Sequence, residues 1–199
     1  MKRIFTSLFL ARRFFSIGWA VVVLFVAAYF LSVLLPFAVA AAGLLIGATV
    51  LDAVRLFRLR EGISASRHTL AKWSNGDENP VTVEVQNRYA FPVDVRVLDE
   101  LPEQLQERRL ALRRRIPSGT TAGLAYRVRP LTRGVYAYGA INVLARTAWG
   151  LAERRYKQEQ GREIAVYPSY IHLRKYELMA EVDLYSRTGM RKVRRSSQR

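Results

Sequence analysis

The chain has 199 residues and no cysteine, which excludes disulfides, thiolate metal sites and a cysteine nucleophile. Histidine is nearly as scarce, because His68 and His172 are the only two, and we expect both to be structural or exposed. The Gly-x-Ser-x-Gly elbow, the P-loop, the His-Glu-x-x-His motif and the Gly-x-Gly-x-x-Gly motif are absent as well. These absences predict a protein that is not an enzyme and that needs no cofactor and no metal.

Charge is missing from one long stretch. No charged residue lies between Arg13 and Asp52, and almost every residue there is apolar. One helix over this stretch would be about 57 Å long, whereas the hydrocarbon core of a bilayer is only about 30 Å thick. We therefore predict a transmembrane hairpin over residues 14–54, with spans at about 14–35 and 37–54. The reversal should lie near residues 34–37, because Pro36 disfavours helix at the residue before it.

Basic residues flank this apolar stretch on both sides, and the expected turn carries none. Positive charge stays in the cytoplasm, so both ends of the hairpin should face inward. This predicts a multi-pass membrane protein, with a basic cytoplasmic N-terminus (residues 1–13) and a cytoplasmic soluble domain. The basic residues are Lys2, Arg3, Arg12 and Arg13 before the stretch and Arg55, Arg58 and Arg60 after it.

Two features of the stretch leave alternatives open. Ala38-Val39-Ala40 looks like the cleavage site of a signal peptide, but the apolar stretch continues beyond it, which favours the hairpin. Gly43 and Gly47 place small residues one helical turn apart. Such a stripe serves either to pack the two helices of the hairpin or to pair two copies of the chain, so the oligomeric state stays open.

The pattern changes to a period of two after Arg60. Val81, Val83 and Val85 alternate with polar residues, and further alternating runs follow at 91–97, 110–116 and 124–128. With β-favouring runs at 63–70, 135–144 and 163–167, about seven short strands are expected. Strands at this spacing predict an all-β, immunoglobulin-like sandwich over residues 61–170.

The charge balance is strongly basic, with 32 Lys and Arg against 16 Asp and Glu. Residues 171–199 should form a short helix and a basic tail, whose cations we take as candidate contacts for an anionic surface. The tail would be either a latch on anionic lipid or the lead-in to a further domain. A membrane-tethered module that binds nucleic acid through this tail is the alternative function, although nucleic acid is the less favoured partner. The candidate residues are Arg187, Arg191, Lys192, Arg194, Arg195 and Arg199.

Two other clusters invite functional interpretation. The oxygen-rich segment Asn75-Gly76-Asp77-Glu78-Asn79 could suggest calcium, but it lacks the length and terminal Glu of an EF-hand, so a solvated turn is expected. A second basic cluster could contact phosphate groups, but the charged face of an edge strand explains it better. This cluster comprises Arg108, Arg109, Arg113, Arg114 and Arg115.

Several strings, in this order, resemble the domain-of-unknown-function family 58, a group of bacterial membrane proteins often encoded beside MoxR-type AAA ATPases. The most specific is an Arg-Pro-x-x-Arg-Gly-x-Tyr string with a downstream Trp-Gly-Leu and Tyr-Pro. The strings are Asn79-Pro80-Val81-Thr82-Val83 leading to Asn87, Asp99-Glu100-Leu101-Pro102, Arg129-Pro130-Leu131-Thr132-Arg133-Gly134-Val135-Tyr136, Ala148-Trp149-Gly150-Leu151 and Val166-Tyr167-Pro168.

The resemblance implies a non-enzymatic, membrane-anchored interaction or scaffold protein of the bacterial inner membrane that works with a MoxR-type ATPase. It covers the N-terminal part of the family pattern, and the sequence ends before the family's signature block. In the shared strings, Gly134 would occupy a turn with positive φ, and Pro130 would close a strand.

Overall fold

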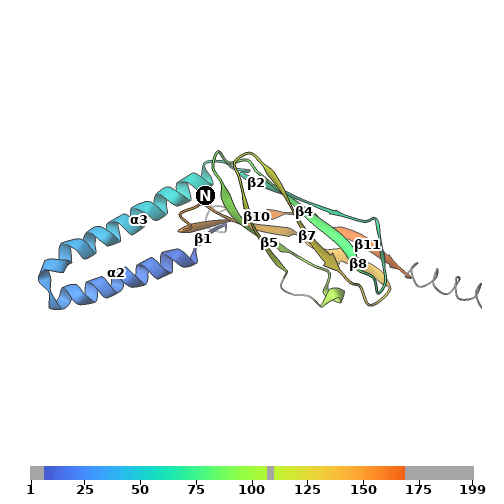
Figure 1. Ribbon diagram of the computed structural model, residues 1–199, viewed down its shortest axis with the longest axis horizontal. Coiled ribbons are helices and arrows are strands. Elements are labelled where there is room, and N and C mark those ends of the chain that lie inside the picture. Colours follow the sequence, from blue (N-terminus) through green and yellow to red (C-terminus); the bar gives the residue numbers. More distant parts are fainter. Residues whose placement is uncertain (1–6, 107–109, 169–199) are drawn as a thin grey trace, which may run out of the picture.

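The computed structural model describes residues 7–106 and 110–168. Two long helices, α2 (Arg12–Phe30) and α3 (Leu35–Phe57), form a hairpin around a single 3-10 turn, η1 (Ser32–Leu34). At 1.5 Å per residue they are about 28 Å and about 34 Å long. Both are long and apolar enough to cross a membrane. They lie side by side, and the end of the hairpin opposite η1 meets the β-domain (Figure 1).

The reversal of the hairpin lies earlier than the sequence suggested. The chain turns at residues 31–34 rather than 34–37, so the first helix is shorter and the second longer than expected. Pro36 does not interrupt the helix but lies in the first turn of α3. A backbone N–H has no intrahelical partner at that position, so proline costs little there.

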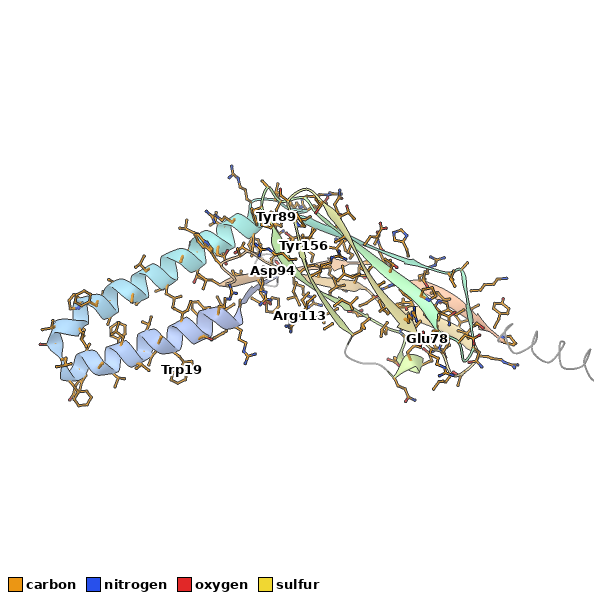
Figure 2. All side chains as sticks on the ribbon, viewed as in Figure 1. Trp19, Glu78, Tyr89, Asp94, Arg113 and Tyr156 are labelled. Atoms are coloured by element: carbon orange, nitrogen blue, oxygen red, sulfur yellow. The ribbon has the colours of Figure 1, made fainter. Side chains whose placement is uncertain are left out.

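The hairpin exposes apolar side chains around most of its surface. Trp19 is 71% exposed, Tyr29 86% and Leu44 74%, and Trp19 points away from the other helix (Figure 2). A core helix of a soluble protein would bury such residues, whereas a helix that crosses a membrane exposes them to lipid. A Cβ added at Gly43 or Gly47 would meet nothing within 4 Å, so this stripe is not what packs the two helices together.

Eleven strands lie in the part of the chain that the structure describes. They are β1 (Leu8–Leu10), β2 (Ile63–Thr69), β3 (Lys72–Ser74), β4 (Asn79–Asn87), β5 (Val93–Asp99), β6 (Ala111–Ile116), β7 (Thr121–Val128), β8 (Gly134–Tyr138), β9 (Ile141–Arg146), β10 (Ala152–Gln158) and β11 (Arg162–Tyr167), with a 3-10 turn η2 (Glu103–Leu105) after β5.

The strands form three sheets, ordered β1-β10-β9-β5-β6, β2-β4-β7 and β3-β11-β8. Strands β4 and β5 follow each other in the chain but belong to different sheets. Asn87 stabilises the crossing between them from a fully buried position. Its Nδ2 donates to the carbonyl oxygens of Phe91 (3.0 Å), Ile116 (3.2 Å) and Pro117 (2.9 Å), and its Oδ1 accepts from the backbone N–H of Tyr89.

The core of the domain is a sandwich of alternating side chains, as the sequence predicted. The valines of β4 and β5 point inward from facing sheets and are almost completely buried, while the residues between them are more exposed. The members of this core include Val81, Val83 and Val85 from β4, Val93, Val95 and Val97 from β5, and Leu124 and Tyr126 from β7. The alternating runs therefore identified the interior of the domain correctly.

Three strands were not expected, and one expected run is divided. The short strands β1 and β3 and the polar strand β10 carry no clear apolar alternation. The run at 135–144 divides into β8 and β9 around Gly139-Ala140, where Gly139 N–H donates to the Glu100 carbonyl oxygen (2.9 Å). The predicted helix and tail at 171–199 lie outside the described residues.

One buried polar network crosses the core. Arg67 on β2 pairs with Asp99 on β5, and both side chains are almost completely buried. Tyr126 donates its hydroxyl to Asp99 Oδ2 (2.5 Å). Arg67 also donates to the Gly139 carbonyl oxygen (3.1 Å), and its guanidinium lies 4.1 Å from the centre of the Tyr138 ring. Each charged group is therefore satisfied inside the sandwich, as buried charges require.

Burial of the tyrosines predicts alkaline sensitivity. Desolvation raises the pKa of Tyr138 to about 12 from 10.0, and desolvation together with the Asp99 carboxylate raises the pKa of Tyr126 further. A raised folded-state pKa gives stability that is fully present below the unfolded value and is lost as pH rises through the folded value. We expect the free energy of unfolding to fall above pH 10.0. The phenolate absorbance of the native protein should therefore rise at a higher pH than that of the denatured chain. Coincident titration curves would contradict this expectation.

Candidate functional site: the joint between hairpin and sandwich

Asp52 joins the second helix to the β-domain. It lies in α3, yet its side chain is completely buried. One carboxylate oxygen accepts from the Thr147 hydroxyl, and the other accepts from the backbone N–H groups of Leu151 and Ala152, at 3.0 Å each. The last residues of the apolar helix are thus bound to the segment between β9 and β10, and Leu56 on the same helix enters the hydrophobic core.

The first helix is connected to the same segment. Strand β1 pairs antiparallel with the edge of β10, and the Ala11 backbone N–H donates to the Leu151 carbonyl oxygen (2.9 Å). Arg13 donates to the carbonyl oxygen of Ala148 (2.9 Å). Gly150 has a φ of 64°, which favours glycine, and a Cβ there would lie 3.4 Å from the Arg13 side chain. Both helices therefore attach to one loop, residues 147–151.

Arg154 caps the end of α3. Its guanidinium donates to the carbonyl oxygens of Leu56 (2.6 Å), Leu59 (2.6 Å) and Arg60 (2.8 Å). A cation at a helix C-terminus also interacts favourably with the helix dipole. Tyr89 donates its hydroxyl to the Leu56 carbonyl oxygen as well (2.5 Å), and burial raises the pKa of Tyr89. The Leu56 carbonyl oxygen in the last turn of α3 thus accepts from two side chains of the sandwich, and Arg154 also binds the chain just after the helix.

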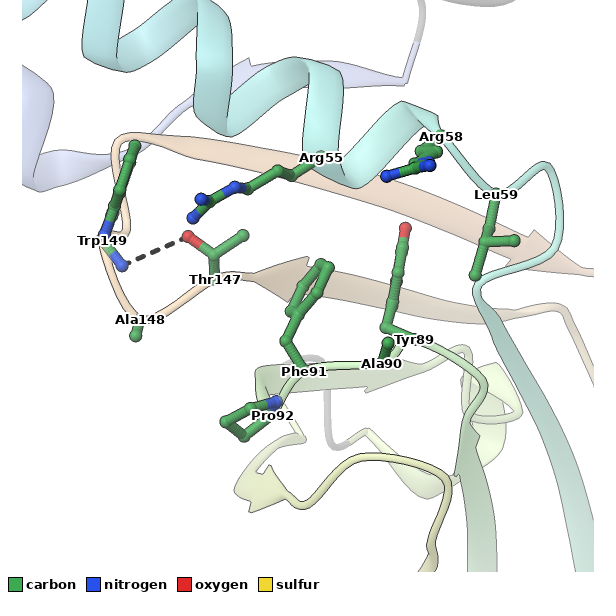
Figure 3. A pocket seen from close by; sticks show the side chains of 10 residues that line it. All are labelled: Arg55, Arg58, Leu59, Tyr89, Ala90, Phe91, Pro92, Thr147, Ala148 and Trp149. Atoms are coloured by element: carbon green, nitrogen blue, oxygen red, sulfur yellow. Dashed lines mark hydrogen bonds between the residues drawn. The ribbon is translucent and has the colours of Figure 1, made fainter.

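A groove of about 700 Å³ lies beside this joint (Figure 3). One wall is the end of α3, with Arg55 and Arg58. The opposite wall comes from two loops of the sandwich, and none of the ten lining residues is acidic. Phe91 lies in the middle of the view, between Tyr89 and Thr147 (Figure 3). The lining residues are Arg55, Arg58, Leu59, Tyr89, Ala90, Phe91, Pro92, Thr147, Ala148 and Trp149.

The candidate tail residues Arg187, Arg191, Lys192, Arg194, Arg195 and Arg199 lie outside the described residues, as do His172, Arg108 and Arg109. The rest of the second basic cluster lies on β6, the edge strand of the five-stranded sheet, as expected. Arg113 and Arg115 are exposed, and Arg114 donates to the Gly123 carbonyl oxygen (2.7 Å).

Residues 75–78 form a turn before β4, which begins at Asn79. Asn79 is buried, and its side chain accepts from the Ser74 backbone N–H and donates to the carbonyl oxygens of Ser74 and Asp77, each at 3.0 Å. The expected turn is confirmed, although residues 75–77 are half-buried rather than fully solvated. His68 lies on β2 with its Nε2 3.3 Å from Glu84 Oε2, and both side chains are more than half exposed. The expectation of an exposed His68 is also confirmed.

The strings behind the family resemblance stabilise turns and the joint. Gly134 has the expected positive φ, at 145°, but it begins strand β8 instead of lying in a turn. The expectation for Pro130 is confirmed, because β7 ends at Val128. Arg129 donates to the Gly76 carbonyl oxygen (2.5 Å), and Glu100 accepts from the Ala140 backbone N–H (3.0 Å). Trp149 and its neighbours form the loop that binds Asp52. Sequence reasoning found this loop as a motif but missed Asp52, although it is the first charge after the apolar stretch.

No protein-family model and no curated protein matches the chain. Solved structures are similar to the sandwich. The ASH/PapD-like domain 7 of human CEP192 is 11% identical at a TM-score of 0.41, over 54% of this chain and 87% of that domain. A fragment of alpha-2-macroglobulin from Escherichia coli is 18% identical at a TM-score of 0.41, over 53% of this chain and 16% of that one.

A CARDB domain from Pyrococcus furiosus, in complex with di-metal ions, is 12% identical at a TM-score of 0.36, over 53% of this chain and 87% of that one. The metal ions belong to that domain. Within residues 7–106 and 110–168, no group of three Asp, Glu or His side chains could bind a metal.

Proposed function

We propose that the chain is a membrane-anchored interaction protein whose hairpin crosses the membrane and presents the sandwich at its surface. The burial of Asp52 carries the proposal. A flexible tether would need no charged residue of a membrane helix inside the soluble domain. Here Asp52 accepts three hydrogen bonds from the 147–152 segment, so the domain is held at one position relative to the helices.

The location and partner of the sandwich form the finer part of the proposal. The arginines at the outer ends of both helices favour the cytoplasmic face of a bacterial inner membrane. The family resemblance favours a MoxR-type AAA ATPase as the partner that docks on the sandwich. The sandwich itself, with an immunoglobulin-like arrangement of strands, offers a rigid surface and no constellation of catalytic side chains within the described residues.

Single cysteines test the insertion and the side of the membrane together, because the natural chain has none. Ser32 lies exposed at the hairpin turn, and Ser118 lies exposed on the sandwich, so they should face opposite compartments. In intact spheroplasts, a membrane-impermeant maleimide should label Ser32→Cys and spare Ser118→Cys, and inside-out vesicles should give the reverse pattern.

Each variant is the control for the other, since both positions are accessible serines. Labelling of both positions from one side would overturn the membrane-spanning hairpin. A reversed pattern would keep the hairpin but place the sandwich outside the cytoplasm.

A further inference from the structure

We propose that the groove beside the joint binds the headgroup of an anionic phospholipid, with its phosphate held by Arg55 and Arg58. The inference rests on the proposed membrane insertion of the hairpin. It assigns a ligand to a site made by the helix and the sandwich together, distinct from the basic tail. The fold places the lining residues beside the last turn of α3, at the end of the hairpin that meets the sandwich.

The length of the helices sets that depth. A hydrocarbon core of about 30 Å takes about 20 helical residues. Counted from the start of α3 at Leu35, this places residues near Arg55 at the far boundary of the core. Arg12 and Arg13 at the start of α2 lie at the same end of the hairpin. The groove therefore opens where lipid phosphates are located.

The Arg55 guanidinium is oriented by an aromatic ring, and the positive charges of Arg55 and Arg58 are available to an anionic ligand. The Arg55 guanidinium lies 4.5 Å from the centre of the Trp149 ring, a stacking contact that holds the planar group while leaving its N–H edge available. In the described part of the chain, neither Arg55 nor Arg58 forms an ion pair. Asp52, three residues before Arg55 on α3, is buried with both oxygens accepting hydrogen bonds. A guanidinium fork of this kind matches the geometry of a phosphate diester.

The rest of the groove suits a lipid better than a free phosphate ion. Phe91, Pro92 and Leu59 give it apolar walls, which would contact the glycerol and upper acyl region. Trp149 is 42% exposed, and indole rings are enriched at the membrane interface. A small soluble anion would leave these walls in water. The apolar walls and the paired arginines together specify a ligand with a phosphate and an acyl chain.

Quenching of Trp149 by brominated lipids tests the assignment on the full chain in nanodiscs. Trp19→Phe removes the lipid-exposed indole, and the third tryptophan, Trp73, is 1% exposed inside the sandwich and out of reach. Brominated phosphatidylglycerol should quench Trp149 more than brominated phosphatidylcholine at equal mole fraction. Arg55→Gln/Arg58→Gln should weaken the apparent affinity for phosphatidylglycerol at least tenfold, since each basic residue near an anionic surface contributes appreciably.

Arg60→Gln is the matched control, because it removes a charge from the same end of α3 without lining the groove. It should keep the preference for phosphatidylglycerol, and added inorganic phosphate should not displace the lipid. Equal quenching by both lipids would overturn the lipid site, and so would an equal loss of affinity for phosphatidylglycerol in the Arg55→Gln/Arg58→Gln variant and in the Arg60→Gln control. Displacement by phosphate would identify a site for soluble phosphate instead. Cysteine labelling of the same variants separates these outcomes from failure of insertion, which would remove the proposed function itself.

Discussion

Replacing Arg67 by Met should destabilise the protein by about 3–5 kcal/mol, because it leaves the Asp99 carboxylate buried without its cation. The Asp99 side chain is 0% exposed, and the Tyr126 hydroxyl would be its remaining side-chain donor. Chemical unfolding of the full chain in detergent, followed by circular dichroism, measures the change. An equally large loss is expected for Asp99→Leu alone, which leaves the guanidinium unpaired.

Two further variants show whether the loss of stability comes from leaving one buried charge without its partner. Arg127→Met breaks an exposed ion pair with Glu78 (2.7 Å, side chains 73% and 61% exposed), and it should change stability by less than about 1 kcal/mol. The double variant Arg67→Met/Asp99→Leu should recover much of the loss, because apolar residues often replace a buried ion pair at little cost. If Arg67→Met behaves like Arg127→Met, the buried network is not what holds the sheets together.

The parts of the fold that could be predicted correctly are those in which burial or exposure of the side chains follows a regular pattern along the chain. The strand β4 alternates because one side faces the core and the other faces water, so Val81, Val83 and Val85 reveal its buried face directly. The hairpin was predictable for a similar reason, since a membrane requires an uninterrupted apolar stretch. Both predictions depend on the environment alone, and no knowledge of distant contacts is needed.

Strand β10 shows why other parts could not be predicted. Its inward positions are Ala152, Arg154 and Tyr156, because they share the face that packs on α3 and the core. An arginine at the middle position hides the alternation. Arg154 is placed there by the carbonyl groups at the end of α3, which are about a hundred residues away in the chain. No local pattern could indicate such a partner.

The joint was missed for the same reason. Asp52 follows the apolar stretch and, in the sequence, resembles a residue that marks the boundary of a membrane span. Its hydrogen-bond donors lie on the 147–151 loop and at the start of β10, about a hundred residues further along. In the sequence, Trp149-Gly150-Leu151 could be identified only as part of a family resemblance, with no indication of its contact with α3. The contact explains why a loop with a glycine at positive φ follows β9.

Replacing Asp52 by Ala should separate the hairpin from the sandwich. The change leaves the Thr147 hydroxyl and two backbone N–H groups without their acceptor in a buried site, at a cost of about 1–3 kcal/mol for each unsatisfied group. We expect a total loss of about 3–5 kcal/mol, since water will reach part of the opened joint. Asp52→Asn keeps one acceptor oxygen, so its stability should lie between those of the unmodified protein and Asp52→Ala.

Two tryptophans can report where the loss occurs. Trp149 lies at the joint, and Trp73 lies within the sandwich against Tyr136 and Tyr138. In a Trp19→Phe background, Asp52→Ala should shift the unfolding transition of Trp149 to a lower denaturant concentration than that of Trp73, because the joint opens before the core. The control Asp94→Ala removes a half-buried carboxylate from β5 and should leave the two transitions coincident. Coincident transitions in Asp52→Ala, with little loss of stability, would show that Asp52 is not the residue that fixes the sandwich to the helical hairpin.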